Sequence, residues 1–155
     1  MIQLIPGDWL TFRPIKNPKE CRIEWCEQVD FIAWLREFYP AYAVMTLHPA
    51  NEGDILPQHR QNQIKAGLLK GASDVIILKA GTSWPAGLIE LKRCWRKSRP
   101  TPEQCELLRL ARTDGKFAAV AHGADAAKAA FMFYLTGDLR GVEITNKMDT
   151  LSTRE

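Results

Sequence analysis

Three residues near the middle of the chain have the types and spacing needed for metal-assisted phosphodiester cleavage. Glu90 and Lys92 lie two residues apart in a predicted strand over 87–93, so their side chains point to the same face. Asp74 precedes another predicted strand, 75–79, and a hairpin between the two strands can bring both carboxylates together. Two close carboxylates repel and require a cation, and hard oxygen ligands with open water positions select Mg²⁺. Lys92 can then orient a water molecule and offset phosphate charge, although a Glu/Lys pair taken alone is more typical of a half-buried strand with a solvent-facing pair.

The hydrophobic pattern predicts the elements that must position these residues. Helices are predicted over 18–38, 58–69, 101–113 and 124–135, and strands over 41–47, 75–79, 87–93, 116–121 and 141–144. Residues 1–18 are predicted to be a loosely packed lead-in, and 145–155 a flexible tail. This order predicts a single α/β domain over 1–155, in which helices flank a central mixed β-sheet.

Composition and charge narrow the classes of function. The 155 residues include no apolar run near the ~18 residues that span a bilayer, so we expect no membrane segment. The four cysteines form no CxxC pair, and the N-terminus lacks the features of a signal peptide, which favours reduced thiols and a cytoplasmic location. The segment 58–113 holds eleven Lys/Arg and four Asp/Glu, a net charge of +7, whereas the rest of the chain carries −4. Such a basic segment suggests a polyanionic partner, although a solvated charged face explains it equally well.

An ordered set of motifs resembles a known nuclease family. Ser73-Asp74 followed by Glu90-Leu91-Lys92 is similar to the PD-(D/E)xK signature, and the surrounding motifs resemble its VRR-NUC branch over about residues 20–135. Those motifs are Glu24 with Gln28, Trp34, Tyr39-Pro40, Pro49-Ala50-Asn51-Glu52-Gly53, Gly67 with Gly71, Gly87 to Arg93, Thr101 to Gln104, and the Gly- and Ala-rich run from Gly115 to Leu135. Two departures stand out: Ser73 replaces the usual proline, and Ala50 is inserted in the Pro-Asn-Glu-Gly loop.

The resemblance implies a PD-(D/E)xK restriction-endonuclease-like fold and a role for each site residue. Asp74 and Glu90 would bind Mg²⁺, for which Mn²⁺ substitutes, together with the backbone carbonyl of Leu91. Lys92 would orient the attacking water or stabilise the transition state. Gln104 lies near the site in the family, but it also fits a capping box with Thr101, and both roles can hold. Glu24 is a further candidate metal ligand, with Glu27 as its competitor.

The same comparison suggests how DNA would be bound. Four cations follow the catalytic strand and could neutralise phosphates, and two further residues would border the cleft. These candidate DNA-binding residues are Arg93, Arg96, Lys97, Arg99, Asn51 and Arg60. The three histidines are expected to be ordinary surface or packing residues.

Taken together, these features predict a Mg²⁺-dependent DNA endonuclease that is selective for DNA structure. Small members of the family resemble Holliday-junction resolvases or flap-type nucleases and are typical of phages and bacteria, which implies the bacterial cytoplasm. A homodimer is expected, because the apolar residues of helix 18–38 occupy more than one face. Two alternatives remain: a sequence-specific restriction-like nuclease, and a DNA-binding module that keeps the fold without turnover.

Overall fold

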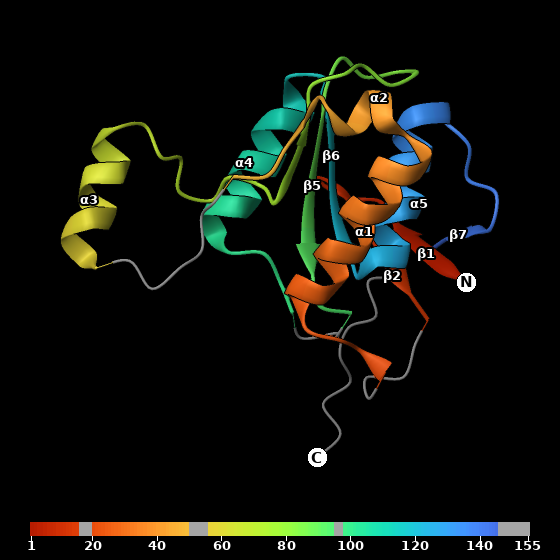
Figure 1. Cartoon of the computed structure of the whole chain (residues 1–155). Helices are drawn as coiled ribbons and strands as arrows, with labels where there is room; N and C mark the ends of the chain where they lie inside the picture. The colour runs from red at the N-terminus through yellow and green to blue at the C-terminus, as the bar shows by residue number, and fades with distance from the viewer. Residues whose placement is uncertain (16–19, 50–55, 95–97, 146–155) are drawn as a thin grey trace.

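The computed structural model describes residues 1–15, 20–49, 56–94 and 98–145. Its strands are β1 (Ile2–Ile5), β2 (Leu10–Pro14), β3 (Thr46–Leu47), β4 (Val75–Ile77), β5 (Gly87–Lys92), β6 (Phe117–His122) and β7 (Val142–Ile144). Its helices are α1 (Glu24–Phe38), α2 (Pro40–Ala43), α3 (Pro57–Lys65), α4 (Pro102–Thr113) and α5 (Ala124–Thr136). The described strands form one mixed sheet in the order β3-β4-β5-β6-β2-β1-β7. Figure 1 shows β5 and β6 in the middle of the molecule, with helices on either side. The predicted fold class, a mixed sheet flanked by helices, is therefore confirmed.

Two parallel strands form the centre of this sheet. Every residue of β5 and β6 is buried, and their register pairs Gly87 with Phe117 and Lys92 with His122. On its other side β5 pairs antiparallel with β4, so that Val75 faces Ile89. Burial on both faces is typical of the centre of an α/β sheet. A carboxylate and an ammonium group on β5 are therefore unusual and require partners.

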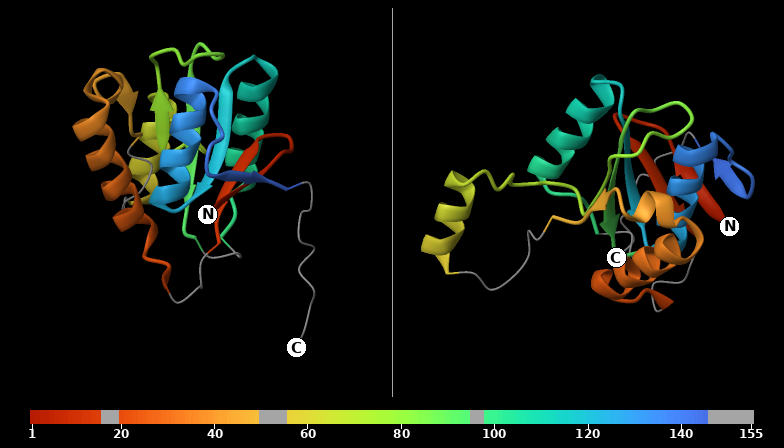
Figure 2. Two further views of the ribbon diagram at one scale, coloured as in Figure 1. Left: turned by 90° about the vertical axis from the view of Figure 1, so that its right-hand side faces the viewer. Right: turned by 45° about the horizontal axis from the view of Figure 1, so that its top comes forward.

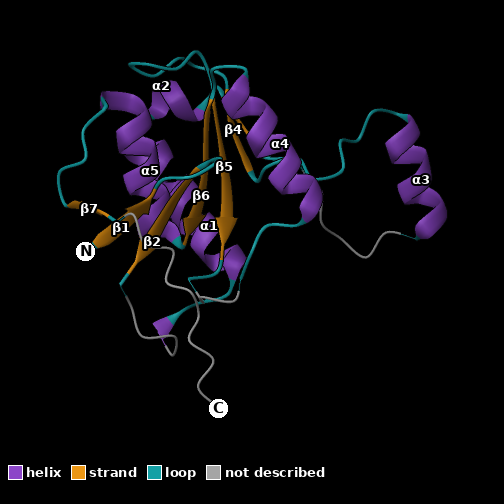
Figure 3. Cartoon of the chain, turned by 180° about the vertical axis from the view of Figure 1, so that it is seen from behind, coloured by secondary structure: helices purple, strands orange, loops and turns teal. Residues whose placement is uncertain are grey.

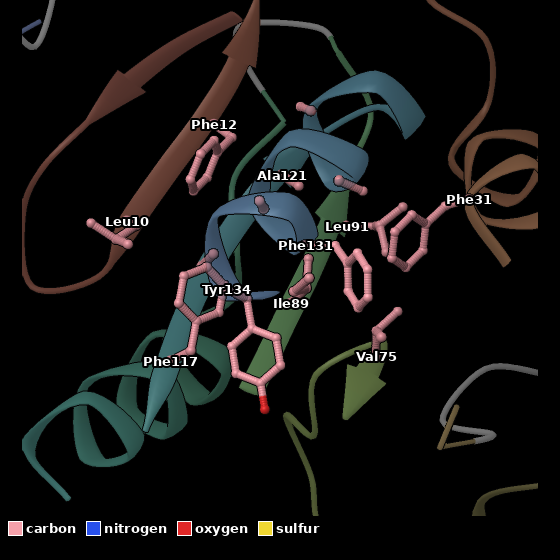
Figure 4. Packing of buried hydrophobic residues seen from close by; sticks show 14 of the residues in the cluster. Leu10, Phe12, Phe31, Val75, Ile89, Leu91, Phe117, Ala121, Phe131 and Tyr134 are labelled. Carbon is pink, nitrogen blue, oxygen red and sulfur yellow. The ribbon is translucent and has the colours of Figure 1, made fainter. Parts of the chain in front are cut away.

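Helices cover both faces of the sheet and divide the core into two layers. On one face, α1 and α5 enclose an aromatic cluster that includes Phe31, Phe117, Phe131 and Tyr134 (Figure 4). On the other face, α4 covers a smaller aliphatic cluster (Figure 3); its buried members are Leu88, Leu108, Ala111, Ala118 and Val120. Because side chains alternate along a strand, Glu90 and Lys92 share the α4 side of β5 with Leu88. Ile89 and Leu91 point into the aromatic cluster instead.

Two parts of the chain differ from the sequence prediction. Residues 1–15 are not a loose lead-in, because β1 and β2 pair antiparallel and β2 joins β6, which extends the sheet. The predicted strand over 41–47 is largely wrong, since Pro40 begins the short helix α2 and only Thr46 and Leu47 form a strand. Proline suits the first turn of a helix, where no N–H partner is needed.

Two helices also begin or lie differently from expectation. Helix α1 begins at Glu24, about 1.7 turns after the predicted start at Pro18. Helix α3 ends at Lys65, contains no buried residue and stands away from the sheet in Figure 1 and in the right-hand view of Figure 2.

A disulfide joins Cys21 and Cys94, which are 73 residues apart. The expectation of four reduced cysteines is therefore wrong for this pair, whereas Cys26 and Cys105 are free thiols. The bond links the segment before α1 to the segment after β5, so it lies beside the candidate site. None of the described helices is long and apolar enough to cross a bilayer.

Candidate active site

The two central carboxylates meet across the antiparallel pair of β4 and β5. The register pairs Val75 with Ile89, and one step further it places Asp74 opposite Glu90. The Oδ2 atom of Asp74 accepts a hydrogen bond of 2.8 Å from the backbone N–H of Leu91. This contact holds the Asp74 side chain over the end of β5, on the face where Glu90 lies.

Lys92 and Glu24 complete a cluster of charged groups around Glu90. The ammonium of Lys92 lies 2.7 Å from Oε1 of Glu90 and 3.6 Å from Oε1 of Glu24. Glu24, the first residue of α1, also accepts a hydrogen bond of 3.2 Å from the backbone N–H of Arg93. The start of α1 thus brings a third carboxylate to the end of the catalytic strand.

Burial gives Glu90 unusual electrostatics. Its side chain is fully buried, and burial together with the neighbouring charge of Asp74 raises its pKa to about 8, although Lys92 acts in the opposite direction. For Lys92, burial is the largest influence and would lower the pKa, but Glu90, Glu24 and Asp74 together outweigh it and the pKa lies above its usual value. Oε1 of Glu90 forms an ion pair with the Lys92 ammonium, whereas Oε2 has no hydrogen-bond partner among the described residues.

This donor set fits a hard divalent cation. Asp74 and Glu90 offer carboxylate oxygens, and a buried carboxylate oxygen without a hydrogen-bond donor, such as Oε2 of Glu90, is favoured by a cation beside it. The described residues contain no group of three or more His, Cys, Asp and Glu side chains arranged to hold a metal ion. The protein ligands would therefore be two carboxylates and the carbonyl of Leu91, with water in the remaining positions, which is the pattern that Mg²⁺ tolerates.

The structure places the competing carboxylates Glu24 and Glu27 in different surroundings. Glu27 is buried, and its Oε2 accepts a 2.7 Å hydrogen bond from the backbone N–H of Ala124, at the start of α5. Arg22 pairs with the same carboxylate at 3.3 Å. Gly123, the N-cap of α5, has no side chain to provide this acceptor. Glu27 therefore caps α5, and Glu24 is the member of the pair that lies beside Lys92.

Gln104 forms the predicted capping box at the start of α4. Its Oε1 accepts from the backbone N–H of Thr101 at 2.8 Å, and the Thr101 hydroxyl accepts from the backbone N–H of Gln104 at 3.3 Å. Gly71, in the loop before Asp74, lies against this helix start, because a Cβ at Gly71 would come within 2.9 Å of the Gln104 backbone nitrogen. Gln104 thus supports the loop that leads to Asp74.

The predicted DNA-binding residues lie in several places. Arg93 follows β5, and its guanidinium donates to the backbone carbonyl of Cys21 at 3.0 Å. Arg99 is exposed between β5 and α4. Arg60 lies on α3, apart from the site in Figure 1. The other three, Asn51, Arg96 and Lys97, lie outside the described residues.

Two histidines have closer links to the site than the sequence suggested. His122 is buried beside Lys92, and Nδ1 donates to the backbone carbonyl of Arg93 at 3.1 Å. Burial, with positive charges nearby, lowers the pKa of His122 to about 4, so its ring is neutral at pH 7. His48 contacts the backbone carbonyl of Asp74 at 2.6 Å. Its role could not be read from the sequence, because it depends on the register between β3 and β4.

The topology and the meeting of Asp74, Glu90 and Lys92 at the end of the central strands are consistent with the PD-(D/E)xK nuclease-like fold. A solved structure of a VRR_NUC domain protein is similar to this chain, with a TM-score of 0.61 and 20% sequence identity. The alignment covers 81% of this chain and 94% of the other. The chain therefore has the VRR-NUC fold that the motifs predicted. No protein-family model and no curated protein matches the chain.

Proposed function

We propose that this protein is a Mg²⁺-dependent DNA endonuclease that hydrolyses phosphodiester bonds. The observation that carries this proposal is the fully buried Glu90 carboxylate, which lies opposite Asp74 and 2.7 Å from the Lys92 ammonium. The similarity to a VRR_NUC domain protein supports a nuclease, and hence a DNA substrate. A binding module would gain nothing from carboxylates that face phosphate, which argues against the non-catalytic alternative.

Each residue of the site has a proposed task. Asp74, Glu90 and the carbonyl of Leu91 hold Mg²⁺ or Mn²⁺, with Glu24 as an additional carboxylate. When bound, the metal polarises a phosphoryl oxygen and lowers the pKa of water. Lys92, whose ammonium is held between Glu90 and Glu24, orients the attacking water or stabilises charge that develops on the phosphate.

Residues around this centre have supporting tasks. Gln104 holds the start of α4 and the adjacent loop, and its amide NH₂ group is the part that could face the substrate. Arg93 and Arg99, with Arg96, Lys97, Asn51 and Arg60, are proposed to bind the phosphate backbone. Such contacts are independent of sequence and weaken as salt concentration rises.

The experiment that tests this activity is a cleavage panel. Single strands, flaps, duplexes and four-way junctions are incubated with Mg²⁺, with Mn²⁺ or with EDTA, and the cut sites are mapped. We expect metal-dependent cleavage that Asp74→Asn and Glu90→Gln abolish and Lys92→Ala slows by at least ~10²-fold. DNA binding should survive all three substitutions. Wild-type cleavage by Glu90→Gln would refute the site, and base-specific cutting of duplex DNA would instead favour the restriction-like alternative.

We further propose that the enzyme is a homodimer that cuts branched DNA such as Holliday junctions. Residues 1–15 lie in the sheet and do not cover the outer face of α1, which leaves Trp25, Val29 and Phe38 exposed at 69, 44 and 59%. Trp25 and Val29 also line a groove of about 420 Å³ that continues to Thr46 on β3. A two-fold dimer through this surface would present two sites to a junction of matching symmetry. A monomer in light scattering that still makes paired cuts would contradict this proposal.

For the location we propose the cytoplasm, of the bacterial host if the protein is phage-encoded, because its DNA substrate is there. The Cys21–Cys94 disulfide is an observation against this location, since such bonds are rare in cytosolic proteins. The oxidation state of these two cysteines in protein trapped directly from cells tests it.

A further inference from the structure

The ladder between β3 and β4 lacks a donor at the position of Asp74. In this antiparallel pair Thr46 faces Ile77 and Leu47 faces Ile76. The backbone N–H of Leu78 donates to the carbonyl of Met45 at 2.9 Å. Hydrogen-bonded pairs in an antiparallel ladder recur at every second residue. Continued two residues beyond the end of β3, the same register would set Pro49 opposite Asp74, and proline has no N–H to donate to the Asp74 carbonyl.

The side chain of His48 supplies the donor that Pro49 cannot. Its Nδ1 lies 2.6 Å from the carbonyl oxygen of Asp74. Because a carbonyl can only accept, Nδ1 carries the proton in this contact. The amide nitrogen of Gln28 lies against the same ring, 2.7 Å from Nδ1 and 3.1 Å from Nε2.

Asp74, whose carboxylate is a proposed metal ligand, is held from two sides. On the β5 side, the N–H of Leu91 binds the Asp74 carboxylate at 2.8 Å. On the β3 side, His48 binds the Asp74 backbone. Gln28 lies one helical turn after Glu24 on α1, so the chain of contacts also ties the strand to the helix that brings the third carboxylate to the site.

We propose that His48 is a positioning residue for the metal site, acting through Asp74 and backed by Gln28. This inference rests on the proposed function, because it requires Asp74 to be a metal ligand. His48 fixes the backbone from which the carboxylate projects, which sets the distance between the oxygens of Asp74 and Glu90. Without it, the end of β4 is held against β5 alone, and metal binding must first order Asp74.

The test measures metal affinity in the absence of DNA. Free Mn²⁺ is quantified by electron paramagnetic resonance during titration of the full-length protein and its variants. We expect His48→Ala to weaken Mn²⁺ binding on the order of 10-fold, the low end of the range for residues that orient metal ligands. His48→Asn places an amide NH₂ where Nδ1–H lies and should restore most of the affinity. His48→Gln, whose amide lies one methylene further out, should not.

Two further variants make the result specific. His59→Ala, on the exposed helix α3, is the matched control and should bind Mn²⁺ like the wild type. Asp74→Asn is the reference for loss of the site. If wild type and Asp74→Asn bind Mn²⁺ equally, the proposed metal site fails and this inference with it. If Asp74→Asn loses binding while a folded His48→Ala retains wild-type affinity, the positioning role alone is refuted. Should His48→Ala fail to fold, equal affinities for His48→Asn and His48→Gln refute it as well.

Discussion

Glutamine in place of the buried Glu90 should make the metal-free protein more stable at pH 8, while it removes the proposed activity. The Glu90 carboxyl has a pKa of about 8 in the folded protein, against 4.5 for an ordinary glutamate. Between these two values the folded state holds a proton that the unfolded state has lost. Stability contributed by Glu90 is therefore fully present below pH 4.5 and is lost as the pH rises through 8.

The size of the effect follows from the interval between the two pKa values. At 1.36 kcal/mol per pKa unit, this interval corresponds to about 5 kcal/mol at most in favour of unfolding above pH 8. Glutamine resembles the protonated acid in shape and carries no charge, so the variant avoids this cost. In the wild type the ammonium of Lys92 also lies 3.6 Å from Oε1 of Glu24. Lys92 therefore keeps a counter-charge in the variant.

Urea unfolding in EDTA, followed by tryptophan fluorescence, measures the difference. We expect Glu90→Gln to match the wild type near pH 4.5 and to exceed its free energy of unfolding by several kcal/mol at pH 8. Mg²⁺ should stabilise the wild type and leave the variant unchanged, because a ligand that binds only the folded state adds to its stability. Glu37→Gln, an exposed substitution on α1 that keeps Glu90, is the control, and its free energy of unfolding should follow that of the wild type at both pH values. A variant no more stable than the wild type at pH 8 would refute the reasoning about burial.

Three further predictions concern groups around the site. Glu27→Ala should lower the free energy of unfolding by about 2 kcal/mol in urea denaturation, because α5 loses its buried cap. The variant should still cleave DNA. Loss of activity at full stability would instead place Glu27 in the site. Cys94→Ser, or reduction of the protein, should destabilise it by up to about 4 kcal/mol, since the disulfide closes a loop of 73 residues; equal unfolding curves with and without reductant would contradict this. The pKa of His122 is about 4 in the folded protein, against 6.5 for an ordinary histidine, so the free energy of unfolding should fall by about 3 kcal/mol as the pH drops from 6.5 to 4. This pH dependence is measured in the Glu90→Gln background, where the opposing pH dependence from Glu90 is absent. It should vanish when His122→Gln is added.

The geometry of the central cluster could be predicted because it depends on local rules. Alternation along a strand puts Glu90 and Lys92 on one face, and the antiparallel pairing of two neighbouring strands brings Asp74 opposite Glu90. The capping box of Thr101 and Gln104 depends on a spacing of three residues and formed as expected. In each case the partners are close in sequence or are joined by one hairpin.

Features that depend on distant pairing could not be predicted in this way. The apolar alternation of Leu10 and Phe12 is a strand signal, but only the parallel contact of β2 with β6, far along the chain, makes residues 1–15 part of the sheet. The bond between Cys21 and Cys94 has no local spacing rule either. His48 illustrates the same limit, since its contact with Asp74 follows from a register that places a proline where the ladder needs a donor.

In helix α1, the choice between Glu24 and Glu27 as the carboxylate near the site needed the structure. The helical periodicity of α1 determines both which residues enter the core and which residues face the site. Glu27, Phe31 and Leu35 recur at four-residue intervals and are the buried residues of the helix. Glu24 and Gln28 form the neighbouring stripe, which contacts Lys92 and His48. A carboxylate on the buried stripe must be neutralised inside the fold, which the start of α5 and Arg22 accomplish for Glu27. The stripe beside it remains available to the candidate site, so the packing of Phe31 and Leu35 on the sheet also fixes the direction in which Glu24 approaches the end of β5.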